Sequence, residues 1–492
     1  MQKEPRVSES ILYEIWKKQH YKSPLKTVSG DDITILDTGA HNQEFGGPDF
    51  KNVRIRIGNL TYIGDFEIDN EFSDWKSHGH NIDSKYSKVI LHASLFNKNN
   101  NAYVYTRDGR KVPSICLSEF IDKEILEQFN EGGDEREEAT ASIKCENNIK
   151  NVPYDLKKNL LLQLGTERFE KKCKKIFERL KELKFIEELN LKEPVVSYEL
   201  TSRFHERQFK HSDFSSKEIW QQLLYELIFE ALGYSKNKFQ MMSLAQSANI
   251  CFLKKIENDG VIIEKYEAAL LNIGGLAKAK KDTEDKRAAD YLERLALHWN
   301  SIRVFYDGKL FDDAQWHFFR LRPQNFPTIR IAGGARVVYG LLYNNLIGTL
   351  VKKITEIHNL TVLINSLRSL FVVKSDGFWK SHFVLNQAAI GEIKYFIGAS
   401  RADEIVVNVI LPYFAVYFEV FQKPHLCKKV LKIYEIYTQR SDNQIIADVA
   451  QALELNEELQ KTIYSQGMIE LFRSFCSKNR CLECQIGKTV FN

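Results

Sequence analysis

The chain has 492 residues, of which 43% are hydrophobic and 27% charged, and its formal net charge is +4. With only 25 glycines and 10 prolines, this composition excludes collagen-like, low-complexity and wholly disordered chains and predicts packed globular domains. The first 150 residues are net negative and the remainder is net positive, which suits either a polyanionic partner for the rear part or plain surface charge.

No segment carries enough apolar sequence for a membrane span. The most apolar stretch, 405–420, contains Asn408, Pro412 and Glu419 and is shorter than the roughly 20 residues that cross a bilayer, so we expect a buried helix there. The N-terminal segment has no apolar core behind its charges, which predicts a cytoplasmic protein without an export signal. The eight cysteines do not form the pattern of a secreted disulfide scaffold, and we expect reduced thiols.

The front of the chain is expected to be a mixed α/β domain over residues 1–130. An amphipathic helix is predicted at 8–19, and Gly58-Asn59 predicts a tight hairpin turn. The expected strands cover 33–36, 53–57, 62–68, 89–96, 103–105 and 112–115, and a short helical turn is expected at 83–87.

A polar, charge-rich linker is predicted at 131–150. Residues 151–492 are expected to form a large all-helical region that is long enough for two subdomains. The fold class is therefore α+β. The expected helices cover 154–183, 217–232, 288–298, a segment after Pro327, 385–438 and 443–474.

The stretch from His41 to His92 concentrates histidines and carboxylates, which are the donors that a divalent cation site requires. Asp49 opens one strand of the hairpin and Glu67 lies near the end of the return strand, so the two acids are expected at one edge of the sheet. On the return strand, Glu67 and Asp69 share a face because side chains alternate. Asp49 is out of phase with them, and a bend or bulge near Pro48 is needed to turn it toward Glu67.

A helix with Glu14, then Pro48-Asp49 on a strand, a hairpin and Glu67-Ile68-Asp69 on the return strand resembles the PD-(D/E)XK nuclease superfamily over about residues 8–116. The resemblance implies a divalent-metal-dependent phosphodiesterase that acts on nucleic acid. Mg²⁺ or Mn²⁺ would be held by Asp49, Glu67 and the carbonyl of Ile68, with Glu14 orienting a ligand or a water.

Asp69 stands where that superfamily usually has a lysine that polarises the attacking water. The resemblance therefore implies that another group takes over proton transfer, with His78 and His80 the nearest candidates beside Lys76. The alternative is a non-catalytic scaffold that keeps the nuclease-like fold and binds nucleic acid or a protein.

Other uses of the segment around these histidines stay open. His78, His80 and Asp83 are similar to the metal-binding loop of binuclear metallohydrolases, but Asp83 lies one residue further along the chain than the aspartate of that motif. The other interpretation is a loop with exposed histidines in which Asp83 caps a short helix. His92 is expected to be a buried core histidine. Trp75 is expected either to stack on a base or to anchor the loop on the sheet.

Four arginines are candidate phosphate contacts. Arg54 and Arg56 lie on the polar face of the first hairpin strand, where they would contact nucleic acid or balance the acids of the return strand. Arg322 and Arg330 flank Pro327, a residue that suits the first turn of a helix whose N–H groups could cradle phosphate; an ordinary interhelical loop is the other interpretation.

Three cysteines crowd into nine residues near the end of the sequence: Cys476, Cys481 and Cys484. Their C-x4-C-x2-C spacing occurs in iron–sulfur proteins and predicts an iron–sulfur cluster or a Zn²⁺ ion, unless they are ordinary thiols. Cys427 or His425 is expected to supply the fourth ligand, with Cys145 a weaker choice.

The motifs GPDF, SDW, HGH, VILH and RPQNFPTIR, together with the cysteine-bearing end, look like an uncharacterised bacterial family catalogued as domain of unknown function family 2851. This likeness runs over the whole chain. It implies the extent of the protein's domains and no activity.

Overall fold

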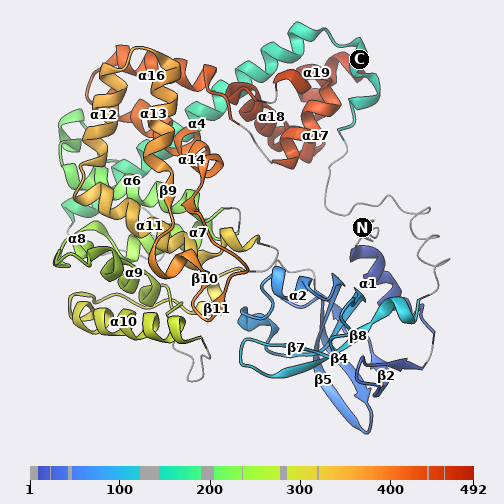
Figure 1. The fold of residues 1–492 in the computed structure, drawn as a ribbon. Helices are drawn as coiled ribbons and strands as arrows, with labels where there is room; N and C mark the ends of the chain where they lie inside the picture. The colour runs from blue at the N-terminus through green and yellow to red at the C-terminus, as the bar shows by residue number, and fades with distance from the viewer. Residues whose placement is uncertain are drawn as a thin grey trace. The chain divides into compact units, whose positions relative to one another are not determined.

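The computed structural model describes residues 9–22, 24–42, 47–121, 143–189, 204, 206–234, 236–277, 285–318, 321–439, 443–458 and 460–491. The chain forms two compact units, Met1–Ala139 with Asp312–Pro327, and Thr140–Phe311 with Thr328–Asn492. The first is built on a sheet and the second is mostly helical (Figure 1), so the α+β prediction is confirmed. Most of the expected linker lies outside the described residues.

Eight strands make the sheet of the first unit: β1 (Leu25–Lys26), β2 (Asp32–Asp37), β3 (Ala40–His41), β4 (Phe50–Ile57), β5 (Leu60–Glu71), β6 (Val89–Phe96), β7 (Tyr103–Tyr105) and β8 (Lys111–Cys116). Their order is β1-β2-β4-β5-β6-β8-β7, with β3 on β4. The pairs from β1 to β5 are antiparallel, β6 runs parallel to β5 and β8, and β7 is antiparallel to β8. All six predicted strands and the predicted hairpin are present.

One face of this sheet packs against helix α1 (Glu9–Lys18). Leu12, Ile15 and Trp16 lie on a single side of the helix because they are three and four residues apart, and all three are buried. Trp16 stacks on Phe66 of β5 with ring centroids 3.7 Å apart. Full burial of a large apolar side chain contributes about 1.5–3 kcal/mol, so this contact fixes α1 to the sheet.

The other face is covered by helix α2 (Asp74–Ser77) and the short 3₁₀ helix η1 (Ser84–Tyr86). Trp75 and Tyr86 are buried there against Val89 and Val112. The indole of Trp75 donates a hydrogen bond to the carbonyl of Tyr105 at 3.0 Å, so this tryptophan anchors the loop and is not a surface platform for a base.

Asp83 caps η1, as one of the sequence interpretations expected, because its carboxylate accepts the N–H of Lys85 at 2.9 Å. This bond gives the Asp83 side chain a local role in the turn.

A bulge in β4 changes the phase of the hairpin. Phe50 pairs with Phe66 and Val53 pairs with Gly64, so β4 holds one residue more than β5 in this interval, and Asn52 adopts a left-handed backbone with φ +57°. The expected bulge is thus present, a few residues beyond Pro48. As a result Phe50 and Val53 both face the α1 core, and Asp49 falls on the opposite face.

The segment Asp312–Pro327 packs within the first unit, although it follows the first unit's other residues by a long stretch of helical sequence. Asp313 forms an ion pair with Arg107, and the Nζ atom of Lys85 lies 3.2 Å from the Nδ1 atom of His317. Phe318 and Phe326 of this segment lie beside Gly79 of the loop after α2.

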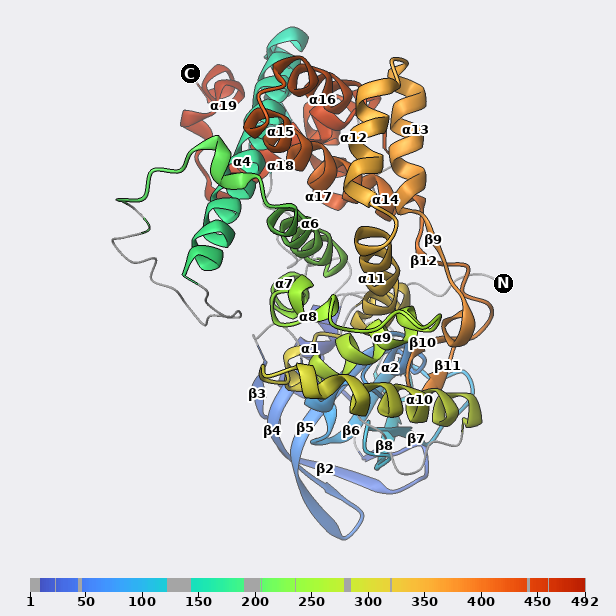
Figure 2. The ribbon, with the colours of Figure 1, turned by 90° about the vertical axis from the view of Figure 1, so that its left-hand side faces the viewer.

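The second unit is built from helices: α4 (Tyr154–Glu188), α6 (Lys217–Leu232), α7 (Lys238–Ser247), α8 (Ile250–Leu253), α9 (Ile262–Ile273), α10 (Lys286–Ile302), α11 (Pro327–Leu342), α12 (Leu346–Glu356), α13 (Leu360–Phe371), α14 (Ala399–Ile405), α15 (Leu411–Val420), α16 (Pro424–Ile436), α17 (Gln444–Leu453), α18 (Thr462–Ser474) and α19 (Gln485–Phe491). The predicted helices correspond to α4, α6, α10, α11 and, within the last two predictions, α14 to α18, whereas α7, α8, α9, α12, α13 and α19 were not predicted. Helices α12 and α13 lie side by side (Figure 2). The apolar stretch 405–420 is a buried helical segment, as expected. None of the helices that the structure describes is both long and apolar enough to cross a membrane.

Two of the predicted long helices are wrong in their extent. A helix was expected from residue 385, but the strands β11 (Gln387–Ala388) and β12 (Tyr395–Ile397) lie there and pair with β10 (His382–Val384) and β9 (Val373–Lys374), which come just before. Residues Tyr395–Ile397 are β-formers, and Gly391 has φ +95°, which a helix does not accept. The expected helix 443–474 is two helices, because Glu454 takes a left-handed conformation that ends α17.

Candidate metal centre

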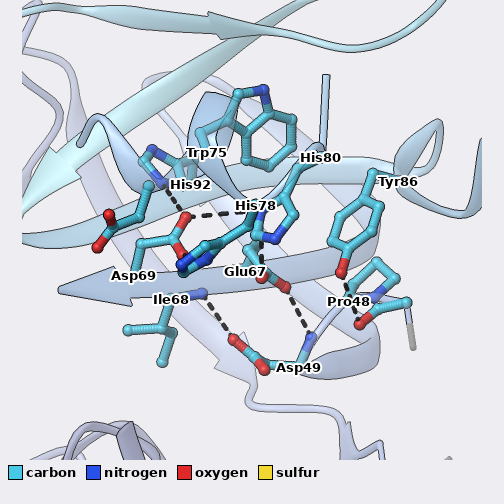
Figure 3. A network of polar contacts seen from close by, with 12 residues as sticks. Pro48, Asp49, Glu67, Ile68, Asp69, Trp75, His78, His80, Tyr86 and His92 are labelled. Carbon is cyan, nitrogen blue, oxygen red and sulfur yellow. Dashed lines mark hydrogen bonds and ion pairs between the residues drawn. The ribbon is translucent and has the colours of Figure 1, made fainter. Parts of the chain in front are cut away.

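The two acids that the hairpin was expected to join do lie together (Figure 3). The N–H of Asp49 donates to Oε2 of Glu67 at 3.0 Å, and the N–H of Ile68 donates to Oδ2 of Asp49 at 2.9 Å. The hydroxyl of Tyr13 on α1 donates to the other Asp49 oxygen at 2.6 Å. Each carboxylate thus holds the main chain of the opposite strand, and Asp49 also ties the hairpin to α1.

Asp69 is the carboxylate on which the histidines of this region converge. Its Oδ1 atom lies 3.2 Å from Nδ1 of His78, and its Oδ2 atom lies 3.1 Å from Nε2 of His92 and 3.6 Å from Nδ1 of His80. His80 Nδ1 is also 3.4 Å from Oε1 of Glu67. One ligand atom from each of Asp69, His78 and His80 lies within 4.8 Å of the other two, a grouping able to hold a metal ion.

The turn that ends α2 explains why His78 and His80 reach the same carboxylate. The N–H of Gly79 donates to the carbonyl of Lys76 at 3.1 Å, and the N–H of His80 donates to the carbonyl of Trp75 at 3.0 Å. This pair of bonds is a Schellman cap, which requires a left-handed residue between them, and Gly79 has φ +82°. The cap folds the chain back, so that residues on either side of the glycine face Asp69.

The neighbouring histidines keep Asp69 ionised in spite of its burial. Burial alone would raise its pKa, but the charge of His80 and the hydrogen bonds from His78 and His92 outweigh burial and hold the pKa of Asp69 well below its usual range. The side chains of Asp69 and His80 are 2% and 0% exposed, whereas His78 is 25% exposed. A ligand from solvent therefore reaches this centre on the side of His78.

The surrounding side chains fix the orientation of the two buried histidines. The ring of His80 stacks on Tyr86 with centroids 4.3 Å apart, and the hydroxyl of Tyr86 donates to the carbonyl of Gly47 at 3.1 Å. His92 is buried, as expected, and its Nδ1 atom lies 3.4 Å from the hydroxyl of Ser114. Packed rings and second hydrogen bonds of this kind restrict the ligand atoms to one geometry.

The expected ligands Asp49 and Glu67 adjoin a grouping that the sequence did not predict as such. Asp49 and Glu67, with the carbonyl of Ile68, stay a prediction, and Asp69, His78 and His80 form a grouping of side chains that could hold an ion, among the residues that the structure describes. Glu67 adjoins this grouping through His80, whereas Asp49 binds Tyr13 and the N–H of Ile68. Two features of the sequence pointed to this grouping: the alternation of side chains along β5, which puts Glu67 and Asp69 on one face, and the close spacing of His78 and His80. The sequence did not show that the two histidines meet Asp69.

The other predicted site residues are dispersed. Glu14 lies in α1, but its side chain is outside the described residues. Arg54 and Arg56 are exposed on β4, opposite Ile63 and Thr61, so the strand register does not place them against Asp65 or Asp69.

Arg322 is exposed and precedes a short 3₁₀ helix, whereas Arg330 is buried in α11. Its guanidinium donates to the carbonyl of Phe396 at 2.7 Å, and burial lowers the pKa of Arg330 to about 9. These contacts give Arg330 a structural role inside the second unit.

Of the predicted cysteine ligands, Cys476, Cys481 and Cys484 follow α18 closely. Cys427 lies in α16, where its thiol donates to the carbonyl of Ala415 at 3.5 Å. Burial raises the pKa of Cys427, and its charged neighbour is Glu419.

A family model described as "Protein of unknown function (DUF2851)" matches residues 9–191 and 183–443 of the chain. No curated protein and no solved structure matches it.

Proposed function

Because the chain belongs to the family described as "Protein of unknown function (DUF2851)", whose description assigns no activity, we propose a function from the site: divalent-metal-dependent hydrolysis of phosphodiesters in nucleic acid. The observation that carries the proposal is the convergence of Asp69, His78 and His80 on one point of the sheet. An ionised carboxylate and two imidazoles are a donor set that divalent metals use in hydrolytic enzymes.

Asp69, His78 and His80 would hold the ion. A bound divalent ion would supply Lewis acidity and lower the pKa of a bound water to near neutrality. Mg²⁺ is bound mainly by oxygen ligands, so the two imidazoles favour Mn²⁺ or Zn²⁺ over Mg²⁺.

The residues around the donor set have separate tasks in this proposal. His92 orients Asp69 and is itself held by the hydroxyl of Ser114. The partly exposed ring of His78 borders the side on which substrate arrives. If both histidines ligate the ion, Glu67 is the adjacent carboxylate whose Oε1 atom can accept the proton of the attacking water.

The choice of a polyanionic substrate rests on the sheet face that carries the site. Arg54 and Arg56 pair with Ile63 and Thr61 of β5, and alternate residues of β5 from 61 to 69 share one face. The two exposed arginines therefore lie on the face of Glu67 and Asp69, where they can contact phosphates. The order of helix, Pro-Asp strand, hairpin and Glu-x-x strand, on which the PD-(D/E)XK resemblance rests, is kept in α1, β4 and β5.

The test is cleavage of single-stranded and duplex DNA and RNA by the metal-stripped full chain, with Mg²⁺, Mn²⁺ or Zn²⁺ added back. We expect cleavage that depends on added metal and falls at least 100-fold in His80→Ala and in Glu67→Ala, and that is unchanged in the exposed variant His358→Ala of the second unit. Cleavage that needs no metal, or that survives in His80→Ala, contradicts the proposal.

One observation favours a second candidate, a non-catalytic scaffold that binds nucleic acid or a protein. Asp49 and Glu67 both accept hydrogen bonds from main-chain N–H groups, so both carboxylates have a structural role. Metal binding that is lost in His80→Ala, without cleavage of any nucleic acid tested, would support the scaffold.

A further inference from the structure

Four of the eight cysteines meet in the second unit, although they come from two distant parts of the sequence. Cys145 precedes the 3₁₀ helix η3 (Glu146–Asn151), and η3 contacts both α17 and α19. The other three lie in the turns between α18 and α19: Cys476, Cys481 and Cys484. Cys145 and Cys484 are buried in one apolar cluster, Cys476 packs against it, and all four thiols are free.

The four cysteines lie on or beside elements that pack together: α19 contacts η3 and the 3₁₀ helix η12 (Cys481–Glu483), and α18 contacts the 3₁₀ helix η11 (Cys476–Lys478). Burial raises the pKa of Cys145 to about 11, and the charges of Cys484 and Cys481 add to the effect. Burial raises the pKa of Cys476 to about 12, with additions from Cys145, Cys484 and Cys481. Thiols ligate a metal as thiolates, so a cation bound here would take the place of their protons.

Burial raises the pKa of Cys484, and two main-chain N–H groups partly oppose this effect. The N–H groups of Ile486 and Gly487 donate toward its sulfur, and the N–H of Cys484 donates to the carbonyl of Cys481 at 3.1 Å. A Cβ atom on Gly487 would lie 2.0 Å from that carbonyl oxygen, so the turn needs a glycine there. Hydrogen bonds to ligating sulfur are a general feature of iron–sulfur sites and set their reduction potential.

We propose that Cys145, Cys476, Cys481 and Cys484 bind an iron–sulfur cluster. The fourth ligand is then Cys145 and not Cys427, which bonds to Ala415 within its own helical neighbourhood. On binding, each thiol releases its proton and the resulting thiolate replaces a thiolate of the donor that delivers a preassembled cluster, so no iron or sulfur atom changes its oxidation state.

In the described part of the chain, the cysteines do not form a ready zinc site, and their spacing along the sequence is one found in iron–sulfur proteins. A tetrahedral zinc site with Zn–S bonds of about 2.3 Å needs its sulfurs roughly 3.8 Å apart. Among the residues that the structure describes, the grouping of three ligand atoms within 4.8 Å of one another is Asp69, His78 and His80, and no three of these cysteines form another. A cluster of several irons sets its thiolates further apart, and C-x4-C-x2-C with a separate fourth cysteine is a known iron–sulfur pattern.

The consequence for the molecule is a cross-link between the start and the end of the second unit. Cys145 lies in the segment that leads into α4, and Cys484 leads into α19. A cluster ligated by both would hold these segments together more firmly than the apolar cluster does alone. This inference stands on residues other than those of the proposed hydrolase centre and does not depend on it.

The test is anaerobic purification of the full chain, followed by determination of iron and acid-labile sulfide and by the visible absorption spectrum before and after dithionite. We expect stoichiometric iron and sulfide and a visible absorption that dithionite bleaches. The matched variants are Cys145→Ser, which should lose most of the iron, and Cys427→Ser, which should keep it. Zinc in place of iron, or iron that is kept in Cys145→Ser and lost in Cys427→Ser, overturns the proposal.

A second measurement covers the case in which Cys145→Ser fails to fold. Alkylation of the wild-type chain, read by mass spectrometry, should modify the four proposed ligands only after the cluster is removed with a chelator and an oxidant. Cys251 is exposed and should react in both states. Equal protection of the four thiols before and after removal would refute ligation.

Discussion

The sharpest test of the metal centre is the substitution Gly79→Ala. Gly79 has φ +82°, and a left-handed backbone costs a residue with a Cβ atom about 1–2 kcal/mol. The added Cβ would also lie 3.2 Å from Cζ of Phe326 and 3.4 Å from Cβ of Phe318, closer than ordinary contact, which adds a few tenths of a kcal/mol. The first unit should therefore lose about 1–2.5 kcal/mol of stability.

Part of this strain is relieved if the cap between His78 and His80 shifts, and the shift would move both histidines away from Asp69. Because 1.4 kcal/mol corresponds to about tenfold in a binding constant, we expect a roughly tenfold loss of Mn²⁺ or Zn²⁺ affinity. Calorimetric titration measures the affinity, and hydrogen exchange of β5 and β6 amides measures the stability of the first unit separately from the second.

The matched control is Gly109→Ala in the turn between β7 and β8. Gly109 has nearly the same φ, +79°, but a Cβ atom there meets nothing within 4 Å. It should cost a similar backbone strain and leave metal affinity unchanged. If both variants bind metal like the wild type, or both lose affinity alike, the cap does not position the histidines and the reasoning fails.

Three further substitutions test the surroundings of the site. Asp69→Asn removes a carboxylate whose pKa is lowered by folding. This carboxylate stabilises the folded chain above its unfolded-state pKa of about 3.9, and the stabilisation is lost as the pH falls toward the folded-state pKa. The free energy of unfolding, measured in acid by tryptophan fluorescence, should therefore depend less on pH in the variant. Tyr13→Phe removes the 2.6 Å hydrogen bond to Asp49. It should lower the stability of the first unit, measured by hydrogen exchange of the β4 amides, by about 1 kcal/mol and leave metal affinity unchanged. A loss of affinity would instead place Asp49 among the ligands. Asn52→Ala should cost about 1 kcal/mol in urea unfolding because φ is +57°, whereas Asn52→Gly should be neutral or slightly stabilising; equal effects of the two would mean that the bulge does not keep this conformation.

The sheet and its hairpin could be predicted because they depend on local signals. Alternation of apolar residues marks β4 and β5, and Gly58-Asn59 marks their turn. The same alternation indicated that Glu67 and Asp69 share a face and that Asp49 needs a bulge to join them, and the structure has such a bulge at Asn52.

The arrangement of the histidines depends on tertiary contacts that no local pattern carries. His78 and His80 reach Asp69 through a cap that is backed by Phe318 and Phe326, which are remote in sequence. The same limit applies to the cysteines. Cys427 is nearer in sequence to the terminal three, yet the packing of η3 on α19 brings Cys145 to them instead.

The return of Asp312–Pro327 to the first unit has a consequence for biosynthesis. His317 follows its contact Lys85 by 232 residues, so a nascent chain leaves the ribosome with the whole sheet made but with the histidine loop still lacking its aromatic support. Emerging domains generally fold in order from the N-terminus, and this one must wait until the part of the helical unit that precedes Asp312, about half of it, has been translated. A fragment cut at the apparent domain end near residue 139 would for the same reason be an incomplete unit, prone to capture by chaperones or proteases.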